Sequence, residues 1–491
     1  MGAWPAGVSG GPCYFTTVRH VWLAAMVACH GKTEPPAKQT PAPAPSPDPA
    51  PEPVAKPEFP DGTRSLEMRR TVAVRLEPGD DAKRIGTVAI DTRVAFTRTA
   101  HGKGCEKKWI EIVPKGWVCG DHAVPSTKPP YGQEVPHLDR GEIVPGTYGK
   151  VTVASSMIYT LDKKKKKDKD APRTMVEDKP VIGSVNVRKY DELEVDGKTY
   201  WKIAQKDNEY VLKSAITKHT PSMFAGARLA DDTGWSVPFG FVWPRGSGLE
   251  SYTFAKSGGI GVNRQLVART PVPVMETSAD SKWVRIGPRV TDPSAPGSAP
   301  AGEAEWMAAA DVKQFVPKPP PDHLLPNERW IDVDLDAQVL VAYEGTLPVY
   351  ATLVSSGAKD TPTETGVYRM WLKESEADMK GLNGEDPYSV ATVPWTQFFS
   401  PEKGLALHTA YWHDQFGHQR SHGCINLAPR DARWLYFWSD PQVPPGWTMS
   451  AGVAESPGSI VRIRSAADPT PETKGYAKKV LELRVQRGSV Q

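Results

Sequence analysis

Hydrophobic and polar residues alternate along several short stretches in the last third of the chain. Residues 329–335 (RWIDVDL) and 338–343 (QVLVAY) place apolar side chains at every second position, which is the period of a β-strand with one buried face. A Gly345-Thr346 turn leads into the apolar stretch VYATLVSSG, and a last strand is predicted at 459–464 (SIVRIR). The pattern predicts consecutive antiparallel strands, so we expect this part of the chain to be mostly β.

Residues 429–438 (PRDARWLYFW) give the only convincing helical pattern. Pro429 suits the first position of a helix and Asp431 its first turn, where an acidic side chain is favourable. The acidic, glycine-containing stretch 372–390 (LKESEADMKGLNGEDPYSV) is instead predicted to be an exposed loop.

Three segments in the middle of the chain share a weak repeat, in which one aromatic-led strand is followed by a loop and a second aromatic-led strand. The first strands read WIEI at 109–112, YWKI at 200–203 and WVRI at 283–286. The pattern resembles bacterial SH3-like domains, whose strand pairs often read W-x-x-[IV]…G-W-[VI], and implies small barrels. Generic β packing without kinship is the alternative, with equal weight for the third segment, which carries an insertion at 288–303.

These patterns divide the chain of 491 residues into seven parts. We predict a signal-like segment at 1–29, a Pro/Ala-rich disordered linker at 30–64, SH3-like domains at 65–126, 147–220 and 221–320, a C-terminal domain at 325–465 and a polar tail at 466–491.

The N-terminal segment is similar to a bacterial lipoprotein signal. Arg19 and His20 precede the apolar run VWLAAMVA, and Cys29 follows small residues directly, which is the order in which such a cysteine is lipidated after cleavage. An ordinary short apolar segment is the alternative. The similarity implies export to the periplasm or cell envelope and a membrane anchor at Cys29, and His30 rather than Asp after it favours the outer membrane.

Composition narrows the remaining function classes. Hydrophobic residues make up 39% of the chain, enough for globular cores but too few for a multi-span membrane protein. The net charge of +3 gives no argument for nucleic-acid binding. The one basic run, Lys163 to Lys167, is bracketed by aspartates, and we interpret it as a solvated loop.

Four of the five cysteines have a structural or targeting explanation. Cys13 and Cys29 lie in the signal region, and Cys105 and Cys119 flank a predicted strand pair. In an exported protein such a pair forms a disulfide, with two buried thiols as the alternative. Cys424 is the cysteine left over.

Cys424 ends the sequence Ser421-His422-Gly423-Cys424, with His408 a short loop upstream. A thiol at its ordinary pKa of ~8.5 is mostly protonated at neutral pH, and a neighbouring imidazole can take its proton. Gly423 permits a tight turn that aims nearby amides at one point, as acyl transfer requires. A buried structural thiol and a zinc site are the alternatives, but no C-x-x-C spacing accompanies Cys424.

The C-terminal domain resembles the L,D-transpeptidase family (YkuD-type catalytic domain) in four stretches. These are RWIDVDLDAQVLVAYEG, VSSGAKDTPTETGVY, VPWTQFF and HTAYWHDQFGHQRSHGCINL. The resemblance implies a β-sandwich-type catalytic domain with one or two short helices, and a cysteine enzyme that acts on peptidoglycan stem peptides. In that family the cysteine attacks the carbonyl before a terminal D-alanine, releases it, and passes the acyl group to an amine.

The resemblance also implies roles for individual residues. Cys424 is the nucleophile, His408 the base, and Thr409 the residue whose main chain or side chain orients the imidazole. His422, Gly423 and Cys424 supply the thiolate environment and the oxyanion amides, with Ser421 bracing the loop. No cofactor or metal is implied.

Substrate contacts are less sharply defined. Asn426 fits a position that is either structural or in contact with substrate, and Tyr388 and Trp412 are candidates to line the groove or to lie in the core. The interval between His408 and Ser421 is slightly shorter than usual for the family, so His413 is a second candidate for the base.

Three functions remain open at this point. The first is formation of 3-3 cross-links, or attachment of another amine, by the thioester. The second passes the same acyl group to water, as an L,D-carboxypeptidase or hydrolase. The third is a non-catalytic lipoprotein whose SH3-like units hold the cell wall. The expected partners are therefore stem peptides, the wall and a membrane, with no nucleic acid.

Overall fold

The structure is a computed structural model in which residues 59–162, 174–229, 238–245, 248–287, 305–381 and 388–487 are described. The predicted signal with Cys29, the linker up to residue 58, the Lys163–Lys167 run and the insertion at 288–303 lie outside the described residues. Of the described part, 46% is strand and 8% helix, so the expected mostly β fold is confirmed. None of the helices in these ranges has the length and apolarity needed to cross a membrane.

The first β unit contains eight short strands and a 3-10 turn. They are β1 (Ser65–Met68), β2 (Val72–Arg75), β3 (Arg84–Val88), β4 (Arg93–Val94), β5 (Phe96–Ala100), β6 (Trp109–Ile112), β7 (Trp117–Cys119), η1 (Gly120–His122) and β8 (Ala123–Ser126). Cys105 and Cys119 form a disulfide beside β7.

The second β unit has the same number of strands. They are β9 (Thr147–Val151), β10 (Met157–Leu161), β11 (Met175–Pro180), β12 (Ser184–Lys189), β13 (Asp191–Val195), β14 (Lys198–Lys202), β15 (Glu209–Leu212) and β16 (Ile216–Lys218), with η2 (Lys213–Ala215) before the last.

The third β unit begins with a strand that belongs to the sheet of the C-terminal domain. Its elements are β17 (Ala227–Arg228), β18 (Phe239–Val242), β19 (Glu250–Phe254), β20 (Val262–Val267), β21 (Pro271–Thr277), β22 (Trp283–Ile286), β23 (Glu305–Ala308), η4 (Ala309–Asp311) and β24 (Val312–Phe315).

The repeat seen in the sequence has a structural counterpart. In each unit the two aromatic-led strands pair antiparallel: β6 with β7, β14 with β15, and β22 with β23. Each pair is followed by a three-residue 3-10 turn and one more strand. The three units therefore share a strand–strand–turn–strand module.

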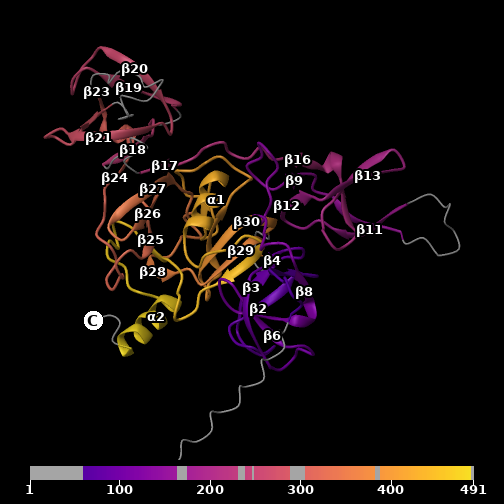
Figure 1. Cartoon of the computed structure of the whole chain (residues 1–491). Coiled ribbons are helices and arrows are strands. Elements are labelled where there is room, and N and C mark those ends of the chain that lie inside the picture. Colours follow the sequence, from indigo (N-terminus) through magenta and orange to yellow (C-terminus); the bar gives the residue numbers. More distant parts are fainter. Residues whose placement is uncertain are drawn as a thin grey trace, which may run out of the picture. The chain divides into compact units, whose positions relative to one another are not determined.

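The predicted small barrels are not found, because the described strands form no closed barrel. Instead, edge strands of the units pair with strands of the C-terminal domain. β3 pairs with β33 (Trp447–Ala451), and β12 runs parallel to β30 (Tyr388–Ser400) (Figure 1). Pairing with another sheet satisfies the edge hydrogen bonds that barrel closure would otherwise satisfy. Gly86 permits the first contact, because a Cβ there would lie 2.0 Å from the Trp447 ring.

The C-terminal domain packs two β layers around one core. Its elements are β25 (Arg329–Asp334), β26 (Val339–Glu344), β27 (Leu347–Leu353), β28 (Gly366–Arg369), β29 (Leu372–Gly381), β30, β31 (Leu405–Thr409), β32 (Ile425–Leu427), α1 (Pro429–Trp438), β33, β34 (Ile460–Arg464) and α2 (Gly475–Gln486). One layer has the strand order β17-β27-β26-β25-β34-β28, and the other contains β29 to β33.

Apolar side chains from both layers meet between them, as the alternating sequence pattern predicts. Ile331 and Leu340 come from one layer, Leu407 and Ile425 from the other, and all four are fully buried. The predicted helix 429–438 is α1, which adds Leu435 to this core and contacts β30 and β31. The domain has the β-sandwich architecture that was expected.

One local prediction is wrong, and another segment has structure that its composition does not reveal. Residues 372–381 and 388–390 are strands of the β29–β30 hairpin and not an exposed loop. Lys373 is fully buried there, and its ammonium donates to the carbonyl oxygens of Tyr436 (2.8 Å) and Ser439 at the C-terminal end of α1, where a positive charge is favourable. The segment after residue 466, interpreted from its polarity as a tail, contains α2, which buries Ala477 and Val480.

Candidate active site

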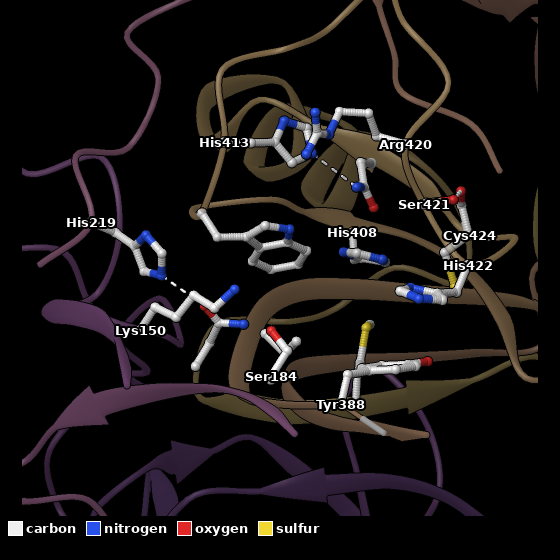
Figure 2. Close-up of a pocket in the computed structure, with 15 residues that line it drawn as sticks. Lys150, Ser184, His219, Tyr388, His408, His413, Arg420, Ser421, His422 and Cys424 are labelled. Atoms are coloured by element: carbon white, nitrogen blue, oxygen red, sulfur yellow. Dashed lines mark hydrogen bonds between the residues drawn. The ribbon is translucent and has the colours of Figure 1, made fainter. Parts of the chain in front are cut away.

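Two neighbouring strands bring Cys424 and His408 to the same place. β31 and β32 are parallel, with His408 opposite Asn426, and Cys424 directly precedes β32. The backbone amide of Ala406, also in β31, hydrogen-bonds to the Cys424 thiol. Both side chains line a cavity of about 300 Å³ (Figure 2).

The His408 ring is held in one tautomer. Its Nδ1 lies 2.9 Å from the main-chain oxygen of Thr409, and because a carbonyl only accepts, Nδ1 carries the proton. Nε2 therefore has the free lone pair and can accept a proton. The ring is buried, and burial lowers the pKa of His408 to about 4, so the imidazole is neutral at physiological pH.

The pKa of the Cys424 thiol is shifted in the opposite direction, upward. Burial raises the pKa of Cys424 to about 11, with the Ala406 amide as a smaller opposing influence. The thiol and the imidazole, which line the same cavity, are thus both neutral in the unliganded site. The ionised thiolate expected from the sequence is not the favoured resting form, and proton transfer has to accompany attack on a substrate.

The segment 354–363 clamps the loop that carries Cys424. Ser421 donates its N–H to Ser356 O (2.9 Å), and Thr363 Oγ1 donates to Gly423 O (2.8 Å). Further bonds run from Ala358 N and from Thr361 Oγ1 to Ser421 O, at 2.8 and 2.9 Å. The stretch VSSGAKDTPT therefore fixes the shape of the loop SHGC through these hydrogen bonds, which explains why both stretches occur together in the sequence.

Within the loop, Ser421 uses its hydroxyl as a brace. Its Oγ accepts from Gly423 N–H at 3.1 Å and donates to Cys424 O. The Gly423 amide is thereby occupied, whereas among the described residues the amides of His422 and Cys424 have no partner. Gly423 has φ +112°, a conformation that favours glycine. The free amides on either side of it can donate hydrogen bonds to a developing oxyanion.

His413 is tied down at both ring nitrogens. Its Nδ1 accepts from Gln415 N–H at 3.1 Å, so its proton is on Nε2. With the side-chain amide of Asn426 turned so that its oxygen faces the ring, Nε2 donates to that oxygen, which otherwise has no partner among the described residues. Because both ring nitrogens of His413 already take part in hydrogen bonds, this ring is poorly placed to take the thiol proton. The geometry therefore favours His408 over His413 as the base, and gives His413 and Asn426 a shared role in positioning the loop.

Burial distinguishes the aromatic residues that can contact substrate from one that lies in the core. The exposed ring of His422 stacks on Tyr388 with centroids 4.4 Å apart, and Trp412 lies 5.9 Å from His408. Both aromatic residues line the cavity. Trp395 is fully buried in the core, so it holds the fold and does not meet substrate.

Several cavity residues carry no signal in the sequence. Lys150, Ser184, Asn186 and His219 come from the second β unit, and Arg420 comes from the loop before Cys424. The third unit reaches the same loop, since Lys313 Nζ donates to Gly417 O at 2.6 Å and Arg269 pairs with Asp414. Such contacts join segments far apart in the chain, so local patterns do not reveal them.

A metal centre has little support at the site. Among the described residues, the one cluster of ligand-type side chains within metal-binding distance is Cys105, Cys119 and Asp121, and its two sulfurs are bonded to each other. It lies in the first β unit, and neither Cys424 nor His408 belongs to it.

Comparison with solved structures gives L,D-transpeptidases at low overall similarity. A cysteine-to-serine mutant of an Enterococcus faecium enzyme is 27% identical over 28% of this chain and 50% of its own, with a TM-score of 0.23. An enzyme from Mycobacterium smegmatis is 20% identical over 40% of this chain and all of its own, also at 0.23. L,D-transpeptidase 3 from Mycobacterium tuberculosis is 18% identical over 33% and 73%, again at 0.23. The chain thus spans half the length of the first of these.

The curated proteins contain no match to the chain. A family model does match, over the segment that forms most of the β-sandwich and contains both Cys424 and His408. Residues 328–463 of this chain match the YkuD family, the L,D-transpeptidase catalytic domain.

Proposed function

We propose that the protein is a peptidoglycan L,D-transpeptidase that uses Cys424 to transfer the acyl group of a stem tetrapeptide. The observation that carries this is that Cys424 lines the same cavity as an imidazole whose Nδ1 is bound to Thr409 O and whose Nε2 is free to accept a proton. The YkuD match of residues 328–463 supports the substrate class.

In the first half-reaction the Cys424 sulfur attacks the carbonyl that precedes the terminal D-alanine. His408 Nε2 takes the thiol proton in the same step, because neither group is charged beforehand. The oxyanion accepts hydrogen bonds from the amides of His422 and Cys424. Collapse breaks the C–N bond, the D-alanine nitrogen takes the proton from His408, and a thioester remains on Cys424.

In the second half-reaction an amine of another stem peptide attacks the thioester. The amine gives its proton to His408, an amide bond forms, and the sulfur leaves and regains the proton. With water as the acceptor the same thioester gives a shortened stem, which would be carboxypeptidase activity. The two outcomes differ only in the acceptor.

The test is a product analysis by mass spectrometry of purified tetrapeptide-containing wall fragments incubated with the full chain. We expect loss of D-alanine and a new cross-linked dimer. D-alanine loss without dimer identifies water as the acceptor and overturns the transpeptidase assignment. No D-alanine loss at all contradicts acyl transfer by Cys424.

We further propose that the β units are SH3-like modules that hold the enzyme on the wall, and that the chain is exported and lipidated at Cys29. The support for SH3-like modules is the strand–strand–turn–strand module that the three units share, although their strands form no closed barrel. The support for lipidation is the order Arg19, apolar run, small residues and Cys29. In bacteria fed an alkyne-bearing fatty acid, the wild-type chain is expected to be labelled and Cys29→Ser unlabelled. The matched variant Cys13→Ser keeps the label, and equal labelling of Cys29→Ser contradicts the anchor.

A further inference from the structure

The cavity beside Cys424 has a second wall that does not belong to the catalytic domain. Lys150 extends from β9, Ser184 and Asn186 from β12, and His219 follows β16. Figure 2 shows Lys150, Ser184 and His219 on one side, Cys424 and His422 on the other, and His408 between them. Four of the fifteen residues that line the cavity therefore come from the second β unit.

This wall is built into the fold. β12 pairs with β30 so that Ser184 lies opposite Tyr388 and Asn186 opposite Val390. The rings of Tyr148 and Tyr411, both fully buried, stack with centroids 3.9 Å apart. Arg188 forms an ion pair with Glu376 of β29. Backbone pairing, ring stacking and an ion pair together fix the second unit against the site.

The charges that line the cavity are all positive. Lys150 and Arg420 are among the fifteen lining residues, which include no aspartate or glutamate. Within the described ranges, no carboxylate forms an ion pair with Lys150, and Arg420 donates to the neutral oxygen of Gln415. Two cationic groups facing one cavity without an acidic partner favour an anionic ligand.

Asn186 adds a buried donor to these charges. Its side chain is 7% exposed, and its Oδ1 accepts from His219 Nε2 at 2.8 Å. That bond fixes the amide, and among the described residues its Nδ2 has no acceptor. Burial and the nearby Lys150 lower the pKa of His219 to about 4, so the neutral ring holds Asn186 in this orientation across physiological pH. An oriented amide N–H that is open to the cavity and has no acceptor in the protein favours a ligand that supplies one.

We propose that Lys150, Asn186 and Arg420 form a carboxylate subsite that binds a free carboxylate of the stem peptide while Cys424 attacks its scissile carbonyl. The second β unit is then part of the substrate-binding site of the enzyme. A carboxylate fits this set because it carries one negative charge and two oxygens that accept from several donors at once. The inference rests on the proposed function for the identity of the peptide.

The experiment compares Lys150→Met with the matched variant Lys198→Met, an exposed lysine of the same unit that does not line the cavity. The substrates are a stem tetrapeptide with free side carboxylates and the same peptide with those carboxylates amidated. Loss of one charge-assisted hydrogen bond is expected to raise KM for the free peptide about tenfold at unchanged kcat. Amidation should raise the wild-type KM similarly and remove the difference between Lys150→Met and wild type.

A binding measurement separates this inference from the proposed function. In a Cys424→Ala background, calorimetry should show that Lys150→Met weakens the Kd for the free peptide about tenfold and leaves that for the amidated peptide unchanged. Equal affinity with and without Lys150→Met overturns the subsite even when the wild type releases D-alanine. Failure to release D-alanine, with the Kd difference intact, overturns the reaction and leaves the subsite.

Discussion

Cys424→Ala is expected to abolish D-alanine release and cross-linking altogether. The thioester needs the sulfur, and among the described residues no other free cysteine is present to replace it. The loss should exceed about 10⁴-fold, because removal of a covalent nucleophile removes the reaction path itself. Product analysis measures the loss, and an unchanged melting temperature within a few degrees shows that the fold is retained.

The same cysteine can be tested without a peptide substrate. A carbapenem presents a strained carbonyl to the site, so intact-mass measurement should show one adduct on the wild type and none on Cys424→Ala. Cys424→Ser is the matched control, because it keeps the size of the side chain but replaces the thiol with a much weaker acid. D-alanine release by Cys424→Ala at more than a trace, or a carbapenem adduct on it, contradicts the assignment of the nucleophile.

His408→Gln is expected to lower kcat/KM by about 10²- to 10⁴-fold, the usual contribution of a general base. In the wild type only neutral His408 can accept the thiol proton. Its pKa is lowered to about 4 by burial, so kcat/KM should persist as the pH falls through 6.5 and be lost only as it falls through about 4. The pH profile of kcat/KM for the wild type measures this limb.

Two other histidines of the loop serve as comparisons for His408→Gln. His418→Gln alters an exposed ring that does not line the cavity and should change kcat/KM by less than twofold. His413→Gln disturbs the contact with Asn426 and is expected to cost less than His408→Gln. A larger loss for His413→Gln than for His408→Gln would transfer the role of base to His413.

Some of this site could be predicted from the sequence because its signals are local. Period-two alternation marks β25, a continuous apolar run marks β26, and Pro429 marks the start of α1. The candidate catalytic residues are recognisable because the loop that holds Cys424 consists of consecutive residues, 421–424. Its brace, the Ser421 hydroxyl, and its glycine at positive φ belong to the same short stretch.

Other features depend on contacts between distant segments and have no local signal. Residues 372–381 have the composition of a loop, yet they form a strand because they pair with β30 on one side and β33 on the other, and Lys373 finds carbonyl acceptors at the end of α1. Asn186 and His219 look like ordinary strand and loop residues until β12 pairs with β30. The neutral resting state of Cys424 and His408 likewise follows from burial, which the motif does not encode.

Two strand pairings limit how this protein can be truncated. β12 pairs with β30, and β3 pairs with β33. A fragment trimmed to residues 328–463 would leave stretches of β30 and β33 with unsatisfied main-chain groups, and such edges recruit other chains. Size-exclusion chromatography should show this fragment self-associating where residues 59–491 elute as one species. The sequence looks modular, but we expect the segment 328–463 to need the neighbouring strands in order to remain a separate, soluble fragment.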